Sequence, residues 1–444
     1  MAFEFSTDGF LPYDTFDYIY KERKLPEFGE VASPYDRILS SWKFFLANGE
    51  SQMPFGFEAL SFDDSDWDII NVPSTWQTEG YGLPQNLLYN YPAELEKITK
   101  RGEDSISDKY LMKSTNESHD EIGIYRTTVV FTPQDLDRAL YLEASGICGS
   151  CDIYLNGQLI TESHAVMTRK RILLSDSARP GTNQLAIAVY RWDRERYGHI
   201  MKELMNFGFS GLVRPVRIVA EPLLEISNLH LNITNVPDAY VNQLDIINPN
   251  AQSTSLSTSV KNGINRNNFS VTADFRVRNH TDYIMPYQLS VSLMEVRSEY
   301  DPYKLPLVQI SIQSQAGGTA QSRSTSRDKV EFVALDVATW NDAAPVLYDL
   351  IIEVLDSEGR SICVKKKRFG FRTAEILADK LHINDVPVKL NLVRYCEFDP
   401  KGGITVPIGR FRQDIILMKR CGIFSAGAKR PPASQLARST SAAG

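Results

Sequence analysis

The sequence has 444 residues and a formal net charge of -7 at pH 7. This length is enough for two or three domains with complete hydrophobic cores. Lys and Arg are dispersed along an acidic chain, which disfavours a nucleic-acid partner because nucleic-acid-binding domains normally carry a basic stripe. No segment approaches about 18 consecutive apolar residues, so no membrane-spanning segment and no membrane partner are expected.

The first residues, Met1-Ala2-Phe3-Glu4-Phe5, lack a basic region followed by an apolar run, which predicts a cytoplasmic protein. The 5 cysteines are too few and too scattered for a disulfide framework, so reduced thiols are expected. Cys148-Gly149-Ser150-Cys151 has the spacing of half a zinc site, but no second Cys or His pair follows at the required distance. The pattern therefore predicts a glycine turn before a strand, and no metal site is assigned.

Residues 1–35 mix aromatic and charged residues with prolines and predict an extended arm on the first domain. Short apolar runs separated by turns then predict a β-sandwich over residues 36–220. Asn156-Gly157 is a type I′ hairpin signal, and the charged stretch 93–121 predicts a surface excursion. The clearest predicted strands are 127–131, 139–143, 152–155, 171–174, 184–190 and 213–219.

Pro222 marks a domain boundary, and residues 221–374 predict a second, immunoglobulin-like sandwich. Within it, the Ser/Thr/Asn-rich stretch 248–268 predicts a mobile loop. The predicted strands are 229–233, 270–277, 288–296, 307–312, 330–335, 348–354 and 367–372.

The pattern changes again after residue 374. Residues 381–387 predict a hairpin, and apolar residues at 411, 415, 416 and 418 predict a helix over 411–420 with two basic residues in its last turn. Residues 425–444 are Ala, Ser, Pro and Arg without an apolar period, and they predict a disordered tail.

A set of short segments, taken in order, resembles the N-terminal sugar-binding domain of glycoside hydrolase family 2 β-galactosidases. The segments are Phe62-Asp63-Asp64-Ser65-Asp66-Trp67, 72–82 (VPSTWQTEGYG), Ile122-Gly123-Ile124-Tyr125-Arg126, Ile153-Tyr154-Leu155-Asn156-Gly157, Val189-Tyr190-Arg191-Trp192 and Ser210-Gly211-Leu212-Val213-Arg214. The resemblance is dense over roughly residues 36–220 and thinner to about 423. It implies a mainly β chain, with a jelly-roll galactose-binding-like domain (36–220), an immunoglobulin-like sandwich (221–374) and an incomplete (β/α)₈ barrel start (375–424).

A retaining glycosidase needs two carboxyl groups about 5–5.5 Å apart. In the family these are Glu residues on late strands of the barrel, which takes about 250 residues, whereas 70 residues follow residue 374 here. Asn116-Glu117-Ser118-His119 resembles the family's acid/base tetrad, but it lies in the predicted surface excursion without a partner carboxylate. No catalytic residue is therefore assigned.

The first barrel strand shows further departures. The family's Arg followed by His-Glu-His corresponds to Arg394-Tyr395-Cys396-Glu397-Phe398-Asp399-Pro400, so Glu397 and Asp399 are expected to be solvated loop acids rather than ligands. Family members commonly use Mg²⁺ and Na⁺, but those ligands would lie in the missing barrel, and no cofactor is assigned to this chain. Because the resemblance ends soon after Gly422, a shifted reading frame or truncated gene is our hypothesis for the last 20 or so residues.

In the family, an Asn from a Thr-Asn-x-x-Tyr-Pro loop and an Asp after an Arg-Trp pair contact the sugar. Leu88 falls at the Asn position, and a Leu cannot hydrogen-bond to a sugar hydroxyl. The candidate carbohydrate-binding residues are therefore the neighbouring polar residues Asn86, Asn90, Asp193 and Arg194. Core packing is expected ahead of sugar stacking for Trp42, Trp67, Trp76 and Trp192.

Three interpretations follow from these observations. The resemblance implies a β-galactosidase-like glycoside hydrolase acting on terminal β-galactosides, of which this chain is a noncatalytic N-terminal fragment. The first alternative is a carbohydrate-binding module that works without chemistry. The second is a subunit that docks onto a barrel-containing partner chain, because an unpaired barrel strand and an apolar helix face require burial. A β-galactoside is the expected small partner, and a homo-oligomer remains open.

Overall fold

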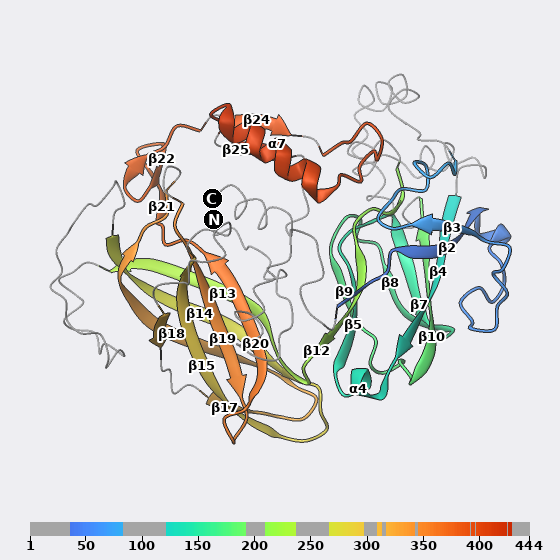
Figure 1. Ribbon diagram of the computed structural model, residues 1–444, viewed down its shortest axis with the longest axis horizontal. Helices are drawn as coiled ribbons and strands as arrows, with labels where there is room; N and C mark the ends of the chain where they lie inside the picture. The colour runs from blue at the N-terminus through green and yellow to red at the C-terminus, as the bar shows by residue number, and fades with distance from the viewer. Residues whose placement is uncertain are drawn as a thin grey trace, which may run out of the picture.

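A computed structural model describes most of the chain between residues 36 and 428 (Figure 1). The described ranges are 36–82, 121–191, 209–236, 266–296, 309–312, 317–341, 345–390, 392–395, 397–423 and 425–428. Within them, strands form two β-sandwiches followed by a small C-terminal unit, which confirms the predicted mainly β fold class. No helix in these ranges is long and apolar enough to cross a membrane.

The first sandwich contains a four-stranded and a six-stranded antiparallel sheet. The four-stranded order β1-β12-β5-β9 uses strands Arg37–Ile38, Val216–Glu221, Ala139–Ala144 and Lys170–Leu173. The six-stranded order β3-β2-β4-β10-β7-β8 uses strands Asp68–Asn71, Ser41–Asn48, Glu121–Phe131, Gly181–Tyr190, Ser150–Leu155 and Gln158–Ser163. The remaining elements are the pair β6 (Ile147–Cys148) with β11 (Gly211–Leu212), the 3-10 helix η1 (Glu50–Gln52) and the short helix α4 (Pro133–Leu136).

The core of the first sandwich is apolar because alternate residues of each strand face the opposite sheet. Trp42 and Trp76 are 1% and 0% exposed and belong to this core, so the expected packing is confirmed for both. Trp67 stacks on Phe45 over the other face of the six-stranded sheet, where it is partly buried. Trp192 lies outside the described residues.

Several strand boundaries differ from the predicted ones; the predicted strand 213–219 is β12, which begins only at Val216 and continues to Glu221. Asn156 and Gly157 join β7 to β8 with φ angles of 54° and 86°, as the type I′ signal predicts. β4 begins at Glu121, which pairs with Asn48 of β2 and is buried. The assignment of Glu121 to a surface excursion is therefore wrong, while the rest of that stretch, 93–120, lies outside the described residues.

The second sandwich packs a three-stranded sheet against a second sheet. The three-stranded order β13-β14-β18 uses strands Leu224–Val236, Arg266–Asn279 and Thr325–Ala338. The other sheet has the order β16-β15-β19-β20, with β17 also paired to β15, and uses strands Gln309–Ile312, Met285–Val296, Leu347–Leu355, Ser361–Phe369 and Gly317–Ala320. Pro222 lies between β12 of the first sandwich and β13 of the second.

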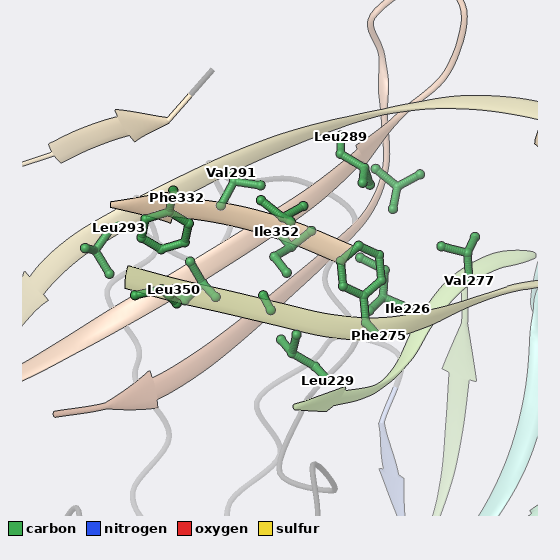
Figure 2. Packing of buried hydrophobic residues seen from close by; sticks show 14 of the residues in the cluster. Ile226, Leu229, Phe275, Val277, Leu289, Val291, Leu293, Phe332, Leu350 and Ile352 are labelled. Atoms are coloured by element: carbon green, nitrogen blue, oxygen red, sulfur yellow. The ribbon is translucent and has the colours of Figure 1, made fainter. Parts of the chain in front are cut away.

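Side chains from both sheets fill the second core. Figure 2 shows Phe275 of β14 and Phe332 of β18 with Leu350 and Ile352 of β19 in one cluster, and all four are buried. The prediction of a mobile loop is wrong for residues 266–268, which belong to β14: residues 266 and 267 pair with β18, and Asn268 pairs with Val236 of β13. The remainder of that stretch lies outside the described residues.

The C-terminal unit begins with a three-stranded sheet, β21 (Ala374–Leu377), β22 (Lys380–Ile383) and β23 (Val386–Pro387). The predicted hairpin is formed by β22 and β23, whose turn residues Asn384 and Asp385 have φ angles of 49° and 64°. The predicted helix is α7 (Ile408–Arg420). It begins earlier than expected, directly after its N-cap residue Pro407.

A parallel strand pair completes the unit. β24 (Leu392–Tyr395) pairs with β25 (Ser425–Ala428), and α7 connects them (Figure 1). The prediction of a tail without structure from residue 425 is therefore wrong for residues 425–428, because their backbone hydrogen-bonds to β24. Residues 429–444 lie outside the described part of the chain. A strand, a helix and a parallel strand make one β/α unit.

Candidate functional site

The stretch Phe62–Trp67 is held by Arg126 of β4. The Arg126 side chain is 1% exposed, forms an ion pair with Asp64 and donates a hydrogen bond to the carbonyl of Ala59 at 2.8 Å. Its guanidinium also lies 5.0 Å from the Phe62 ring centroid, a cation–π distance. Arg126 therefore anchors the loop over the sheet and is not free to bind a sugar.

The segment 72–82 packs onto two other segments that carry the family resemblance. The amides of Ser74 and Trp76 donate to the carbonyls of Leu212 and Ser210 at 2.9 and 3.1 Å. A Cβ on Gly123 would lie 2.7 Å from the Trp76 ring, so only glycine admits the indole at this point of β4. Segment 72–82 is thus held by hydrogen bonds to the segment 210–214 and by the space that Gly123 leaves for Trp76.

Arg191 and Glu121 form the next convergence point. Arg191 is fully buried and pairs with Glu121, and its amide donates to the Glu121 carbonyl at 2.9 Å. A Cβ on Gly82 would lie 2.9 Å from Glu121 Oε1, which places Gly82 beside the same carboxylate. Gly82 and Arg191 are the last described residues before the two candidate sugar-binding segments. Both therefore lie against the same side chain, that of Glu121.

The candidate sugar ligands themselves are not placed. Asn86, Asn90, Asp193 and Arg194 all lie outside the described residues, as do Leu88 and the tetrad at 116–119. What the structure adds is the common origin of the two segments at Glu121, which no local sequence pattern indicates. The assignment of these four residues stays a prediction.

Residues 397–406 sit on the first sandwich. Glu397 pairs with Arg214, and the two side chains are 12% and 5% exposed. Burial raises the pKa of Glu397 although Arg214 opposes the shift. The expectation of a solvated acid is wrong for Glu397, because a buried arginine 183 residues earlier in the sequence holds its carboxylate.

Asp399 has a different, local role. Its Oδ1 accepts hydrogen bonds from the amides of Lys401 and Gly402, both at 2.9 Å. These backbone donors, that of Gly402 first, lower the pKa of the half-buried Asp399. Asp399 therefore caps a turn, as Asp does in many turns, and agrees with the expectation of a loop acid.

The two sandwiches meet through buried charges. Glu221, at the end of β12, accepts from Lys365 of β20 at 2.7 and 2.8 Å and from Arg171 of β9 at 2.6 Å. Glu225 of β13 lies 3.5 Å from the same arginine and accepts from Tyr141 of β5 at 3.1 Å. The carboxylates at this joint are thus engaged by side chains from both sandwiches.

The two cysteines with the spacing of half a zinc site, Cys148 and Cys151, lie in the described part of the chain. Cys148 ends β6 and donates to the Phe209 carbonyl at 3.0 Å, and burial raises the pKa of Cys151 in β7 to about 11. The predicted glycine turn is present at Gly149, with φ of 147°. In the described ranges no group of three or more His, Cys, Asp or Glu side chains is placed to hold a metal ion.

Comparisons with known proteins agree with one another on family. The family model described as "Glycosyl hydrolases family 2" matches residues 243–372. A β-galactosidase of Priestia megaterium is 24% identical over 419 residues, which cover 93% of this chain and 35% of the relative. A β-galactosidase large subunit of Leuconostoc lactis is 26% identical over 381 residues, covering 85% of this chain and 53% of the relative. The chain therefore spans between about a third and about half of these relatives.

Solved structures share the fold. A β-glucuronidase of Bacteroides uniformis superposes with a TM-score of 0.62 at 17% identity, covering 91% of this chain and 41% of that one. A β-glucuronidase of Bifidobacterium dentium complexed with coumarin-3-O-glucuronide gives a TM-score of 0.60 at 15% identity, covering 92% and 60%. At these identities the likeness concerns the arrangement of the sandwiches and says nothing about which sugar is bound.

Proposed function

We propose that this chain, which is similar to glycosyl hydrolases family 2 members over their N-terminal region, supplies the noncatalytic sandwiches of an enzyme that hydrolyses terminal β-galactosides. The observation that carries the proposal is the order of its parts: two sandwiches, then a β/α unit with parallel strands β24 and β25. Parallel strands need a crossover and are normally covered on both faces, which suits the start of a barrel. The choice of β-galactosides rests on the names of the sequence relatives.

The same parts explain why these 444 residues alone should not hydrolyse a glycoside. The chemistry needs two carboxyl groups about 5–5.5 Å apart beside a bound sugar. Glu121, Glu221 and Glu397 each pair with a Lys or Arg of the chain. Each of these carboxyl groups is thus engaged by a basic side chain within the chain itself. The work of the chain is then to hold a sugar-facing edge against a catalytic domain.

An activity assay tests this proposal. The purified chain, expressed in a host without endogenous β-galactosidase, should release no nitrophenol from nitrophenyl β-galactoside or β-glucuronide above a mock purification from the same host. Calorimetric titration with galactose and lactose then asks whether the sandwiches bind sugar without turnover. Saturable binding would support the carbohydrate-binding alternative, whereas hydrolysis that co-purifies with the chain would contradict the noncatalytic assignment.

Docking onto a barrel-containing polypeptide is the second candidate, and exposed apolar side chains favour it. In α7, all of whose residues are described, none is buried, and Ile416 and Leu417 are 40% and 60% exposed. Further exposed apolar side chains in the C-terminal unit are Ile376, Leu377, Val386, Leu390 and Phe398. Exposed apolar surface of this kind favours association. Co-purification with a family 2 barrel, and hydrolysis that appears only on mixing, would support this candidate.

A further inference from the structure

A single arginine contacts both ends of the segment 397–406. Arg214 pairs with Glu397 at the start of the segment, and its Nη1 donates to the carbonyl of Ile404 at 2.9 Å near the end. The same Nη1 also donates to the Val213 carbonyl at 2.9 Å, which holds the guanidinium against its own strand connection. The fork geometry of arginine suits this double role, which a lysine could not reproduce.

Apolar contacts reinforce the polar ones. Ile404 is 5% exposed and packs in a cluster with Cys148, Phe209 and Val213 of the first sandwich. The rings of Phe209 and Phe398 lie 6.3 Å apart. The buried members of this cluster from the first sandwich come from β6 and from residues 209–213, next to the pair β6–β11, and Met167 packs against them. The segment therefore rests in a defined seat on the first sandwich.

The segment also contains a tight turn of its own. The backbones of Asp399 and Gly403 exchange hydrogen bonds at 2.7 and 2.9 Å, which closes a tight turn. Gly403 has φ of 60°, and a Cβ there would lie 3.2 Å from the Phe209 ring. Glycine thus suits both the left-handed backbone conformation and the close approach of Phe209. The turn presents Ile404 to the cluster and Glu397 to Arg214.

We propose that Arg214 and Glu397 are positioning residues that latch residues 397–406 onto the first sandwich, so that the first sandwich sets the place of the loop after β24. The arginine of the Ser210–Arg214 segment then serves this latch and does not bind sugar. This goes beyond the proposed function, because it concerns contacts within the chain and holds for any substrate. The latch also leaves Glu397 unavailable as a metal ligand or catalytic acid.

Hydrogen exchange on the full chain, followed by mass spectrometry, tests the latch. Glu397→Ala and Arg214→Met each remove the ion pair between the two side chains, and amide protection in 397–406 should fall by about tenfold or more. Glu397→Gln keeps an oxygen that accepts a hydrogen bond from Arg214, so protection should stay within about threefold of the parent. Lys401→Gln, an exposed change in the same turn, is the matched control and should leave protection unchanged.

A second variant reaches the same seat by another route. Gly403→Val places a side chain against Phe209 without touching the ion pair, and it should also release 397–406. In every case protection of β10 in the core of the first sandwich should stay at the parent level. The latch is overturned if Glu397→Ala and Arg214→Met change protection in 397–406 by less than about twofold. It is equally overturned if β10 loses as much protection as 397–406, because the residues would then support the whole sandwich.

Discussion

The first sandwich meets its two neighbours through junctions of different chemistry. Toward the second sandwich it presents buried ions, with Glu221 between Arg171 and Lys365. Toward residues 397–406 it presents one ion pair, Arg214 with Glu397, beside an apolar cluster. A joint made of buried ions fails when one partner is removed, because the remaining charge stays in a low dielectric. An apolar seat loses contacts in proportion to what is removed.

The largest expected effect is at the joint between the sandwiches. Lys365→Ala leaves Glu221 with Arg171 alone, and both Lys365 and Glu221 are 2% exposed. We expect the free energy of unfolding to fall by about 3–5 kcal/mol. Urea unfolding of the full chain measures it, with Lys329→Ala as control, since that lysine pairs with Glu331 at the surface and should cost less than about 0.5 kcal/mol. Equal effects of the two variants would remove the contrast between buried and exposed ions.

The apolar seat should give a smaller and more local effect. Ile404→Ala removes a buried side chain from the cluster with Phe209, for about 2–3 kcal/mol of local stability. Hydrogen exchange should show the loss in residues 397–406 while the midpoint of urea unfolding of the sandwiches stays near that of the parent. A loss spread over both sandwiches would mean that the seat and the joint are one cooperative unit.

Asp36 offers a test of charge burial by pH. Burial raises the pKa of Asp36 from 3.8 to about 6, although Arg217 opposes the shift. Because the folded state favours the neutral carboxyl, stability from this group is full below pH 3.8, falls as pH rises to about 6, and is constant above. Asp36→Asn should remove this slope and raise stability at pH 7 by about 1–2 kcal/mol, less than the full shift would give. Urea midpoints between pH 4 and 7.5 would show it, and an unchanged slope would contradict the assignment.

The smallest effect is expected on the exposed helix face. Leu417→Ala changes a side chain that is 60% exposed, so the unfolding free energy of the isolated chain should change by less than about 0.5 kcal/mol. If a barrel-containing polypeptide docks there, the same variant should weaken its binding measurably in a pull-down titration. Unchanged binding would exclude this face as the docking surface.

The features that could be predicted from the sequence are those that a local pattern of residues determines, such as strands and tight turns. Alternating apolar residues predicted many of the strands, though not β2 or β3, and Asn156-Gly157 predicted the β7–β8 hairpin that the structure contains. The sequence did not predict the partners of Glu397 and Glu221, which lie 183 and 144 residues away. Such pairs depend on how sheets stack, which has no period in the sequence. The available signal was the arginine that ends the Gly-containing segment Ser210–Arg214. If such an arginine is buried, an acid is expected beside it.

For the candidate sugar site, too, the sequence indicated one part and only the structure shows the other. Order and spacing of the segments indicated the family, and the comparisons agree. The convergence of Gly82, Glu121 and Arg191 appears only in three dimensions, because β4 and β10 are neighbours in the sheet while their ends are far apart in the chain. Asn86, Asn90, Asp193 and Arg194 remain predictions, which titration with galactose can test one variant at a time.

The most direct test of the account is hydrolysis by the purified chain. Incubated with nitrophenyl β-galactoside, the 444-residue chain should release nitrophenol no faster than a mock purification. Release that exceeds the mock and scales with the concentration of the chain would contradict the claim that these sandwiches support catalysis without performing it.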